Sequence, residues 1–532
     1  MEIYAGALRD RRVRDYLFVR RVLWSGNADN AGLLAGNREI QPQITADNPF
    51  VTIRPGGGIL VDFGIEFHGG IRLVNGFSAG RVRVRFGESA SEAMGSPDPD
   101  HAVHDTVLDV PCMGMLEYGN TAFRFVRIDA VDSAVSLINL LGVALCRDQE
   151  VAGSFRSSDE RLNRIWKTAV YTIRLNMQDY LYDGAKRDRL VFMGDLHPEA
   201  RAVFAAFDDV SIVPDSLDFI VSHSADPKDM NRIRTYPFWW VITLYAYYWR
   251  TGDFDYLAAQ RELLLELLST FATYVDENGV ERVPECRFLD WPNRENPAAL
   301  HAGIQGLLYW TLRHGRKLCR ILECGFPAEA AAAMNRMTCH IPDCGRSKAA
   351  AAMLTLSGLR DCTATIRRDP FSGVSTFFGY YMLLAQPTEP ALELIRRYWG
   401  AMLDFGATTF WEDFDLAWTV DALPITELPQ PGKRDLHADF GAFCYKGLRH
   451  SLCHGWAAGP APFLSERVLG VRFLEPGGRR IAVEPDLGGL EYAEGTVPTA
   501  FGPVKVTADA SGRVETDAPN SIELIEKKGI VA

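Results

Sequence analysis

The chain has 532 residues, too many for a single hydrophobic core, so its length predicts two to four domains. Its hydrophobic content of 47% and charged content of 23% are ordinary for a soluble globular protein. Its formal net charge of −12 would repel nucleic acid phosphates and anionic lipids, so the composition excludes nucleic acid and membrane surfaces as expected partners.

The cysteines and the N-terminal residues indicate the expected redox state, metal content and location of the protein. The 10 cysteines are irregularly spaced, which is typical of reduced thiols in the core. Cys339, His340 and Cys344 have no second ligand pair at zinc-finger spacing, so we expect no metal and no cofactor. Residues 1–12 lack the apolar stretch of a secretory signal, and the most apolar run, 134–146, is too short to cross a bilayer. A cytoplasmic location is the expectation.

The first part of the chain has strand-like patterns. Residues 81–86 alternate strictly between charged and apolar side chains, and 58–63, 70–74 and 123–128 are short apolar runs bounded by turn residues. Short strands separated by turns are typical of an antiparallel β-sandwich, which we predict for residues 1–152.

The middle of the chain changes to a helical period. Ser157-Ser-Asp-Glu160 fits a capping box, and apolar residues then recur every three or four positions. Further helices are predicted at 198–207, 240–250, 257–275, 300–324, 328–337, 347–355, 377–384, 391–403 and 439–454. So many helices without intervening strands favour a toroid of helical hairpins over residues 153–460. Short strands then return, which predicts a small β domain over 461–532.

Residues 183–195 are the densest charge cluster between two predicted helices. They contain three aspartates, three basic residues and two glycines. One interpretation is a solvated, salt-bridged surface turn. Phe192 and the aromatic residues downstream favour the other interpretation, a polar pocket able to stack a ligand.

Other polar and aromatic clusters also lie between predicted helices, at 236–240, 288–292, 406–415 and 450–456. In a helical toroid such loops gather at one mouth of the barrel. Carboxylates beside tryptophan and tyrosine are typical of carbohydrate sites, because sugar C–H faces stack on rings while hydroxyls need polar partners. Glycoside hydrolysis needs two carboxyl groups with opposite tasks.

These motifs resemble those of the α-L-rhamnosidases of glycoside hydrolase family 78, in the six-hairpin glycosidase superfamily. The resemblance covers roughly residues 50–510 and depends on the segments 60–64, 69–73, 153–163, 183–195, 290–291, 408–412 and 451–454. It implies a multidomain protein with a central α/α six-hairpin barrel between N-terminal and C-terminal antiparallel β-sandwich domains. It also implies an exo-acting, inverting hydrolase that releases terminal α-L-rhamnose without a cofactor.

The resemblance assigns the catalytic roles. The general acid of the family is a Glu in the first motif, and its place is taken by Asp188 when counted back from Asp195, in a segment one residue shorter. Asp183 is the alternative acid. Glu412 matches the family base that activates water, and His454 matches a histidine near that water.

The remaining positions are assigned to the substrate. Asp183 and Asp195 match carboxylates that bind sugar hydroxyls, Trp291 matches a stacking residue, and Phe192 replaces a family tryptophan. The full set of expected substrate-binding residues is Asp183, Arg187, Phe192, Asp195, Trp240, Asp290, Trp291 and Trp411. For each tryptophan a place in the hydrophobic core is the alternative.

The acid must keep its proton near neutral pH, whereas a paired arginine lowers a carboxyl pKa by about one to three units. We therefore predict that Arg187 pairs with Asp183, Asp195 or a sugar hydroxyl and leaves Asp188 unpaired. An inverting pair also needs roughly 6.5–9.5 Å between its carboxyl groups.

Two other functions remain open. One is the same barrel acting on another sugar, and the other is a carbohydrate-binding protein with little catalysis. The sequence leaves open the aglycone and the oligomeric state, a homodimer included.

Overall fold

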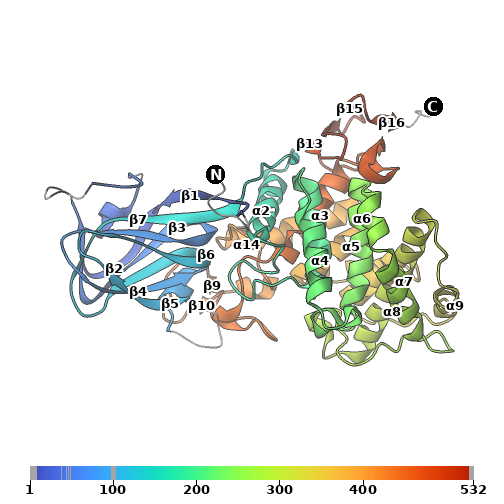
Figure 1. The fold of residues 1–532 in the computed structure, drawn as a ribbon, viewed down its shortest axis with the longest axis horizontal. Coiled ribbons are helices and arrows are strands. Elements are labelled where there is room, and N and C mark those ends of the chain that lie inside the picture. Colours follow the sequence, from blue (N-terminus) through green and yellow to red (C-terminus); the bar gives the residue numbers. More distant parts are fainter. Residues whose placement is uncertain are drawn as a thin grey trace, which may run out of the picture.

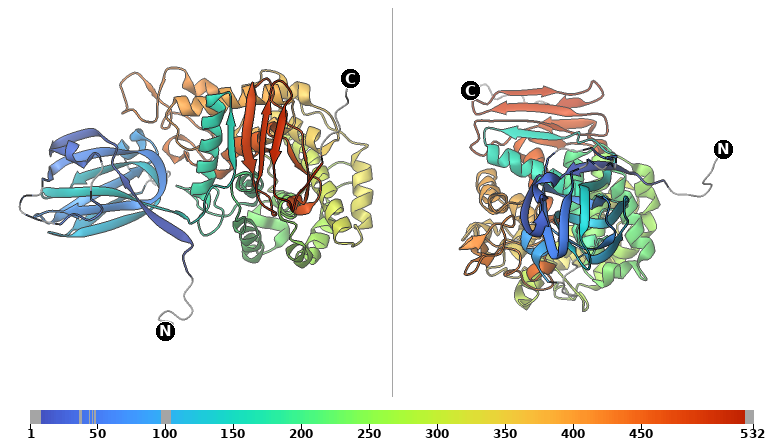
Figure 2. Two further views of the ribbon diagram at one scale, coloured as in Figure 1. Left: turned by 90° about the horizontal axis from the view of Figure 1, so that it is seen from above. Right: turned by 90° about the vertical axis from the view of Figure 1, so that its left-hand side faces the viewer.

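The computed structural model describes residues 9–36, 39–43, 45, 47, 49–96 and 104–525. The outermost residues of both predicted terminal domains, 1–8 and 526–532, lie outside the described part. A β region stands at one end of the molecule, helices extend from it to the opposite end, and a second β region packs on the helices (Figures 1 and 2). The multidomain arrangement of helices flanked by β regions is confirmed.

The N-terminal region is one curved sheet in the described residues. Its strands are β1 (Arg12–Phe18), β2 (Arg21–Asp29), β3 (Val51–Asn75), β4 (Gly80–Gly87), β5 (Asp105–Val110), β6 (Met115–Ala130) and β7 (Val135–Arg147). They run in the order β1-β7-β3-β6-β4-β5, with β2 on β3. Most pairs are antiparallel, but β3 and β7 pair in parallel, so the prediction of purely antiparallel pairing is wrong here. A short helix, α1 (Ala90–Met94), follows β4.

The middle region is helical. Its helices are α2 (Glu160–Asn176), α3 (Met193–Ala206), α4 (Ile212–His223), α5 (Tyr236–Thr251), α6 (Phe254–Ala259), α7 (Arg261–Thr273), α8 (Pro297–Ile321), α9 (Ala328–Met337), α10 (Lys348–Ser357), α11 (Thr363–Arg367), α12 (Thr376–Leu384), α13 (Thr388–Leu394), α14 (Gly400–Asp404) and α15 (Pro460–Phe463). In the described residues, no helix is both long and apolar enough to cross a membrane.

The start of α2 differs in detail from the predicted capping box. Asp159 is the N-cap, and its carboxylate accepts hydrogen bonds from the backbone N–H groups of Arg161 and Leu162. The helix buries the predicted apolar stripe, beginning with Leu162 and Ile165. Local periodicity therefore located the buried face of α2, while the choice of cap depended on the chain before it.

The predicted helix over 439–454 is wrong. This segment contains a short turn at Gly447–Arg449 and otherwise irregular backbone. Gly441 and Gly447 have φ values of +102° and +54°, in the left-handed region that a right-handed helix cannot contain. The α4 helix, in contrast, was not predicted.

The C-terminal strands are β11 (Val471–Phe473), β12 (Arg480–Val483), β13 (Tyr492–Val497), β14 (Val504–Asp509), β15 (Val514–Asp517) and β16 (Glu523–Ile525). They form the sheets β11-β12-β16 and β15-β14-β13-β8. β8 (Ser154–Ser157) precedes α2, so a strand from the start of the predicted helical domain completes a C-terminal sheet. Two short strands, β9 (Ala422–Leu423) and β10 (Arg434–Asp435), pair separately.

The hydrophobic core has two main parts. One continuous cluster of buried side chains runs from Phe155 to Ile522 and joins the helices to the C-terminal sheets. The N-terminal sheet has a core of its own, around Phe67 and Phe123. The contact between the N-terminal sheet and the helices includes a cluster of buried polar groups, described below.

Candidate active site

The predicted acid motif forms a closed loop between α2 and α3. The backbone N–H of Asp183 donates to the Leu190 carbonyl at 3.0 Å, and the Leu190 N–H donates to Asp183 Oδ1 at 2.9 Å. The Ala185 N–H donates to the Cys453 carbonyl, and the Gly455 N–H donates to the Asp183 carbonyl. These bonds hold the motif against residues 453–455, which follow it by about 270 positions.

Three predicted carboxyl groups surround one predicted histidine. His454 Nε2 lies 3.8 Å from Asp183 Oδ2, 4.0 Å from Asp195 Oδ1 and 3.8 Å from Glu412 Oε1. All four side chains are buried, none being more than 5% exposed. The structure thus brings together four residues that are distant in sequence.

Burial controls protonation in this cluster. It raises the pKa of Asp183 and Asp195 well above the usual range, and neighbouring carboxyl groups raise both further. Burial also lowers the pKa of the His454 imidazole well below its ordinary value. Burial thus favours the protonated form of Asp183 and Asp195 and the neutral form of the His454 imidazole. In these forms the groups can both donate hydrogen bonds to sugar hydroxyls and accept them.

Arg187 bridges the predicted acid and the predicted base. Its Nη1 donates to Asp188 Oδ2 at 2.5 Å, its Nη2 donates to both carboxylate oxygens of Glu412, and its Nε donates to the Arg449 carbonyl at 3.0 Å. The prediction that Asp188 would stay unpaired is therefore wrong. Asp188 also has a left-handed φ of +58°.

Glu412 is held on both its backbone and its side chain. The Ser451 N–H donates to Glu412 Oε2 at 3.1 Å, and the Glu412 N–H donates to the Ser451 carbonyl at 2.9 Å. The Glu412 carbonyl accepts hydrogen bonds from Thr376 Oγ1 at 2.5 Å and Trp456 Nε1 at 3.0 Å. The carboxylate is thus fixed from several segments at once.

Asp290 and Trp291 extend the site on the side of Asp413. The Ser375 hydroxyl and the Trp291 N–H donate to the Asp290 carboxylate at 2.7 and 2.9 Å. Burial raises the pKa of Asp290 to about 6, and burial together with the charge of Asp290 raises the pKa of Asp413 to about 7. Trp291 is half-buried, with its ring 5.9 Å from that of Phe443.

The other aromatic candidates differ in their accessibility. Phe192 is half-buried at the start of α3. Trp240 is 0% exposed and Trp411 is 1% exposed, so neither ring has surface available to a ligand in this conformation. Trp240 lies inside the helical core, as the alternative for each tryptophan anticipated.

Glu199 was missed by the sequence reasoning. It lies one turn beyond Asp195 on α3 and is 1% exposed, and its Oε1 has no hydrogen-bond partner among the described residues. Burial and the nearby Asp195 and Asp183 raise its pKa well above the usual range. A Cβ atom at Gly455 would lie 2.2 Å from Glu199 Oε1, so Glu199 packs directly against the residue after His454. The i, i+4 spacing of the two acids was the available signal.

The cluster is closed to solvent around His454, and its accessible members lie at its edge. The Asp188 side chain is 36% exposed. A separate cavity of about 330 Å³ lies away from this cluster, where α3 and α5 meet β11, and it is lined by residues such as Arg201, Trp249 and Phe473. Ligand access to the acidic cluster from the side of Asp188 is consistent with this exposure.

A family model matches part of the helical region. Residues 150–304 match the family model described as the bacterial alpha-L-rhamnosidase 6 hairpin glycosidase domain. No curated protein matches the chain by sequence.

Solved structures resemble this chain over most of its length. The family 78 rhamnosidase of Bacillus sp. GL1 matches with a TM-score of 0.72 and 20% identity, over 93% of this chain and 55% of that one. The rhamnosidase of Klebsiella oxytoca with rhamnose bound matches with a TM-score of 0.70 and 21% identity, over 86% of this chain and 96% of that one. The α-L-rhamnosidase of Streptomyces avermitilis complexed with L-rhamnose matches with a TM-score of 0.72 and 15% identity, over 96% of this chain and 49% of that one.

This chain therefore spans about half the length of the Bacillus and Streptomyces proteins and nearly all of the Klebsiella protein. At these identities the structural matches show a shared fold. The family model over residues 150–304 and the shared fold support the resemblance to the α-L-rhamnosidases found in the sequence.

Proposed function

We propose that this protein is an exo-acting, inverting glycoside hydrolase that releases terminal α-L-rhamnose from oligosaccharides or glycosides. The observation that carries the proposal is the convergence of Asp183, Asp195 and Glu412 on His454. The first part of this helical region, residues 150–304, matches the rhamnosidase family model. We also propose the finer architecture, a six-hairpin toroid between two β-sandwich domains. The name of the matched domain and the run of helices from α2 to α14 support it.

Glu412 is the proposed base. Its carboxylate accepts hydrogen bonds from Arg187 and from the Ser451 N–H, which hold it in one orientation. A water between Glu412 and the anomeric carbon would give up its proton to this carboxylate, and His454, beside Glu412 Oε1, would help to orient that water.

Asp188 is the proposed acid. In an exo-acting enzyme the terminal sugar is buried while the leaving oxygen points toward solvent, so the acid belongs at the edge of the site. Asp188 is the exposed member of the acidic set. One guanidinium separates it from Glu412, which is compatible with the gap of roughly 6.5–9.5 Å that inversion needs. Substrate must displace or share the Arg187 contact for Asp188 to hold a proton.

Asp183 remains the alternative acid, because burial raises the pKa of its carboxyl well above the usual range and so favours the protonated form that a general acid needs. In the main proposal Asp183, Asp195 and Arg187 bind the ring hydroxyls instead. Asp290, Trp291 and Phe192 shape the rest of the sugar pocket, with Trp240 and Trp411 behind it as buried support. No cofactor takes part in this mechanism.

Two alternatives have specific support. The shorter acid and the Phe at position 192 reshape the pocket relative to the family motif, which favours a different sugar. The Arg187–Asp188 ion pair in the closed site favours carbohydrate binding with little catalysis.

The test is hydrolysis of 4-nitrophenyl α-L-rhamnoside beside a panel of other aryl glycosides. We expect turnover of the rhamnoside, a loss of at least about 100-fold in the Glu412→Gln variant, and no loss in the control Glu494→Gln on β13. Proton NMR of the first product should show the inverted anomer. Turnover of another sugar alone would establish the first alternative, and rhamnose binding without turnover would establish the second.

A further inference from the structure

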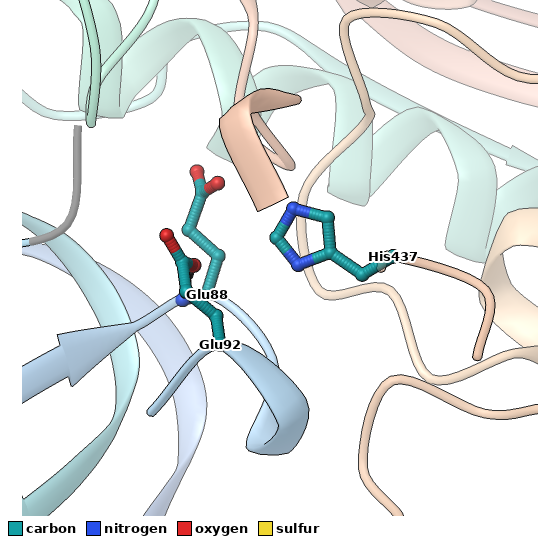
Figure 3. Close-up of side chains that lie close together, drawn as sticks. All are labelled: Glu88, Glu92 and His437. Atoms are coloured by element: carbon teal, nitrogen blue, oxygen red, sulfur yellow. Dashed lines mark hydrogen bonds between the residues drawn. The ribbon is translucent and has the colours of Figure 1, made fainter. Parts of the chain in front are cut away.

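A second buried acidic cluster lies behind the site, where α1 meets the helical region. Glu88, Glu92 and His437 each place a potential ligand atom within 4.8 Å of the others, and all three side chains are buried (Figure 3). This arrangement resembles a metal site. His437, however, already uses both ring nitrogens: Nδ1 lies 2.7 Å from Ser89 Oγ, and Nε2 lies 2.8 Å from the His450 carbonyl.

The cation of this cluster is supplied by the protein. Lys186 Nζ lies 2.9 Å from Glu88 Oε2 and 2.9 Å from Glu92 Oε1, and it also donates to the carbonyls of His450 at 2.9 Å and Leu448 at 3.1 Å. Four acceptors thus surround an ammonium group that has three hydrogens. Burial lowers the pKa of Lys186, but Glu88 and Glu92 more than offset this and raise it, so Lys186 stays charged.

The same cluster reaches the proposed base through one serine. Glu88 Oε1 accepts a hydrogen bond from Ser451 Oγ at 3.1 Å, and Glu88 Oε2 accepts one from the Leu452 N–H at 2.7 Å. The backbone N–H of Ser451 donates in turn to Glu412 Oε2 at 3.1 Å. Segment 448–452 is therefore bound to Lys186 and Glu88 on one side and to Glu412 on the other.

Two adjacent cations of the acid loop hold this segment. Lys186 binds the carbonyls of Leu448 and His450, and Arg187 binds the carbonyl of Arg449 between them. Arg187 also binds Glu412 directly. The loop that contains the proposed acid and the segment that orients the proposed base are thus joined through one pair of neighbouring side chains.

We propose that Lys186 is a positioning residue, anchored by Glu88 and Glu92 of the N-terminal β region, that fixes segment 448–452 and through Ser451 orients the Glu412 carboxylate. This inference rests on the proposed function of Glu412. It makes the N-terminal β region part of the catalytic unit, since that region supplies the two carboxylates that hold the ammonium.

The test separates positioning from stability. Lys186→Met leaves two buried carboxylates without their cation and is expected to lower the midpoint of urea unfolding. The triple variant Lys186→Met/Glu88→Gln/Glu92→Gln removes the charges together and should recover that midpoint. We expect its kcat to stay at least about 10-fold below that of the wild type, with KM within about threefold, because the base is displaced.

Lys348→Met is the matched control. Lys348 is a buried lysine on α10 that donates to the Asp369 carbonyl at 2.7 Å. Its replacement by Met should leave kcat unchanged. If the triple variant does not fold, Ser451→Ala carries the same test, since it removes the Oγ bond to Glu88 and keeps the N–H bond to Glu412. A stable triple variant or a Ser451→Ala variant with wild-type kcat overturns the proposal.

A second readout does not depend on turnover. Hydrogen exchange of the amides in residues 448–454 should be faster in the triple variant than in the wild type and the Lys348→Met control. Unchanged exchange in these residues overturns the proposal that Lys186 fixes segment 448–452, even if the wild type is an active hydrolase. If the wild type cleaves no glycoside, the proposed function fails. Faster exchange in the triple variant would still show that Lys186 fixes segment 448–452. A stoichiometric divalent metal that is lost in Glu92→Gln would overturn the assignment of the cation to Lys186.

Discussion

The guanidinium of Arg187 binds the carboxylate of Glu412, a residue 225 positions further along the chain, through hydrogen bonds from Nη2 to both carboxylate oxygens. Their side chains are 4% and 5% exposed. The pair joins the acid loop to the segment that contains the proposed base. A buried ion pair of this kind is costly to break from one side, because the remaining charge loses its partner without regaining water.

Arg187→Gln should therefore be strongly destabilising, by about 3–5 kcal/mol in urea unfolding. Arg187→Lys should recover only part of that loss, because an ammonium cannot match the guanidinium that reaches Asp188, Glu412 and the Arg449 carbonyl together. The control is Arg156→Gln, which breaks an exposed pair with Glu494 and should cost less than about 1 kcal/mol. Equal stabilities of the Arg187→Gln and Arg156→Gln variants would contradict the assigned role.

Asp188→Asn and Asp183→Asn should differ in their dependence on the leaving group. A general acid matters most when the leaving oxygen is basic, so Asp188→Asn should lower kcat/KM by about 100- to 10,000-fold on an alkyl rhamnoside and far less on a dinitrophenyl rhamnoside. Asp183→Asn should lower kcat/KM on both substrates alike, because it removes a contact to the sugar itself. The exposed neighbour Asp179→Asn serves as control. The opposite pattern would identify Asp183 as the acid.

Trp291 and Trp240 should respond differently to truncation. Trp291 is half-buried beside Asp290, so Trp291→Ala should raise KM about 3- to 10-fold through lost stacking, with little loss of stability. Trp240 is 0% exposed, so Trp240→Ala should lower the free energy of unfolding by about 3–5 kcal/mol. KM of the folded Trp240→Ala protein should be unchanged. A raised KM in that variant would show that Trp240 becomes accessible when substrate binds.

Asp413 should make stability depend on pH. Its pKa is raised to about 7 in the folded protein, against roughly 3.9 for an unfolded chain. Between these values the folded state binds more protons, so the contribution of Asp413 to stability is fully present below about pH 4 and is lost as the pH rises to about 7.

Asp413→Asn cannot lose a proton and should be more stable than the wild type at pH 8, by roughly 1–4 kcal/mol. Urea unfolding at pH 5 and pH 8 measures the difference. Asp517→Asn, on the exposed strand β15, is the control and should leave the pH dependence as in the wild type. If the stability of Asp413→Asn depended on pH as strongly as that of the wild type, another group would be responsible. Asp290 is an example, because its pKa is raised to about 6.

Local patterns in the sequence predicted much of the fold. The helix α9 has the predicted bounds, 328–337, and α2 buries the predicted apolar stripe. Both follow from side chains three or four positions apart, which share a helix face whatever the rest of the chain does. The predicted helix at 439–454 was wrong because glycines at 441 and 447 take left-handed conformations, which apolar periodicity does not report.

By itself the sequence determined the resemblance to the α-L-rhamnosidases, the order of β and helical regions, and most of the polar residues that come together in the site. Only the tertiary structure decided how those residues pair. It placed Arg187 between Asp188 and Glu412, packed Glu199 against Gly455, buried Trp240, and set Lys186 among carboxylates of the N-terminal β region. Periodicity and motifs record interactions between residues close in the chain. Contacts between distant segments arise only when the chain packs together, as they do here between residues 183–199, Glu412 and residues 448–455. The burial that shifts the pKa values of these residues arises in the same way.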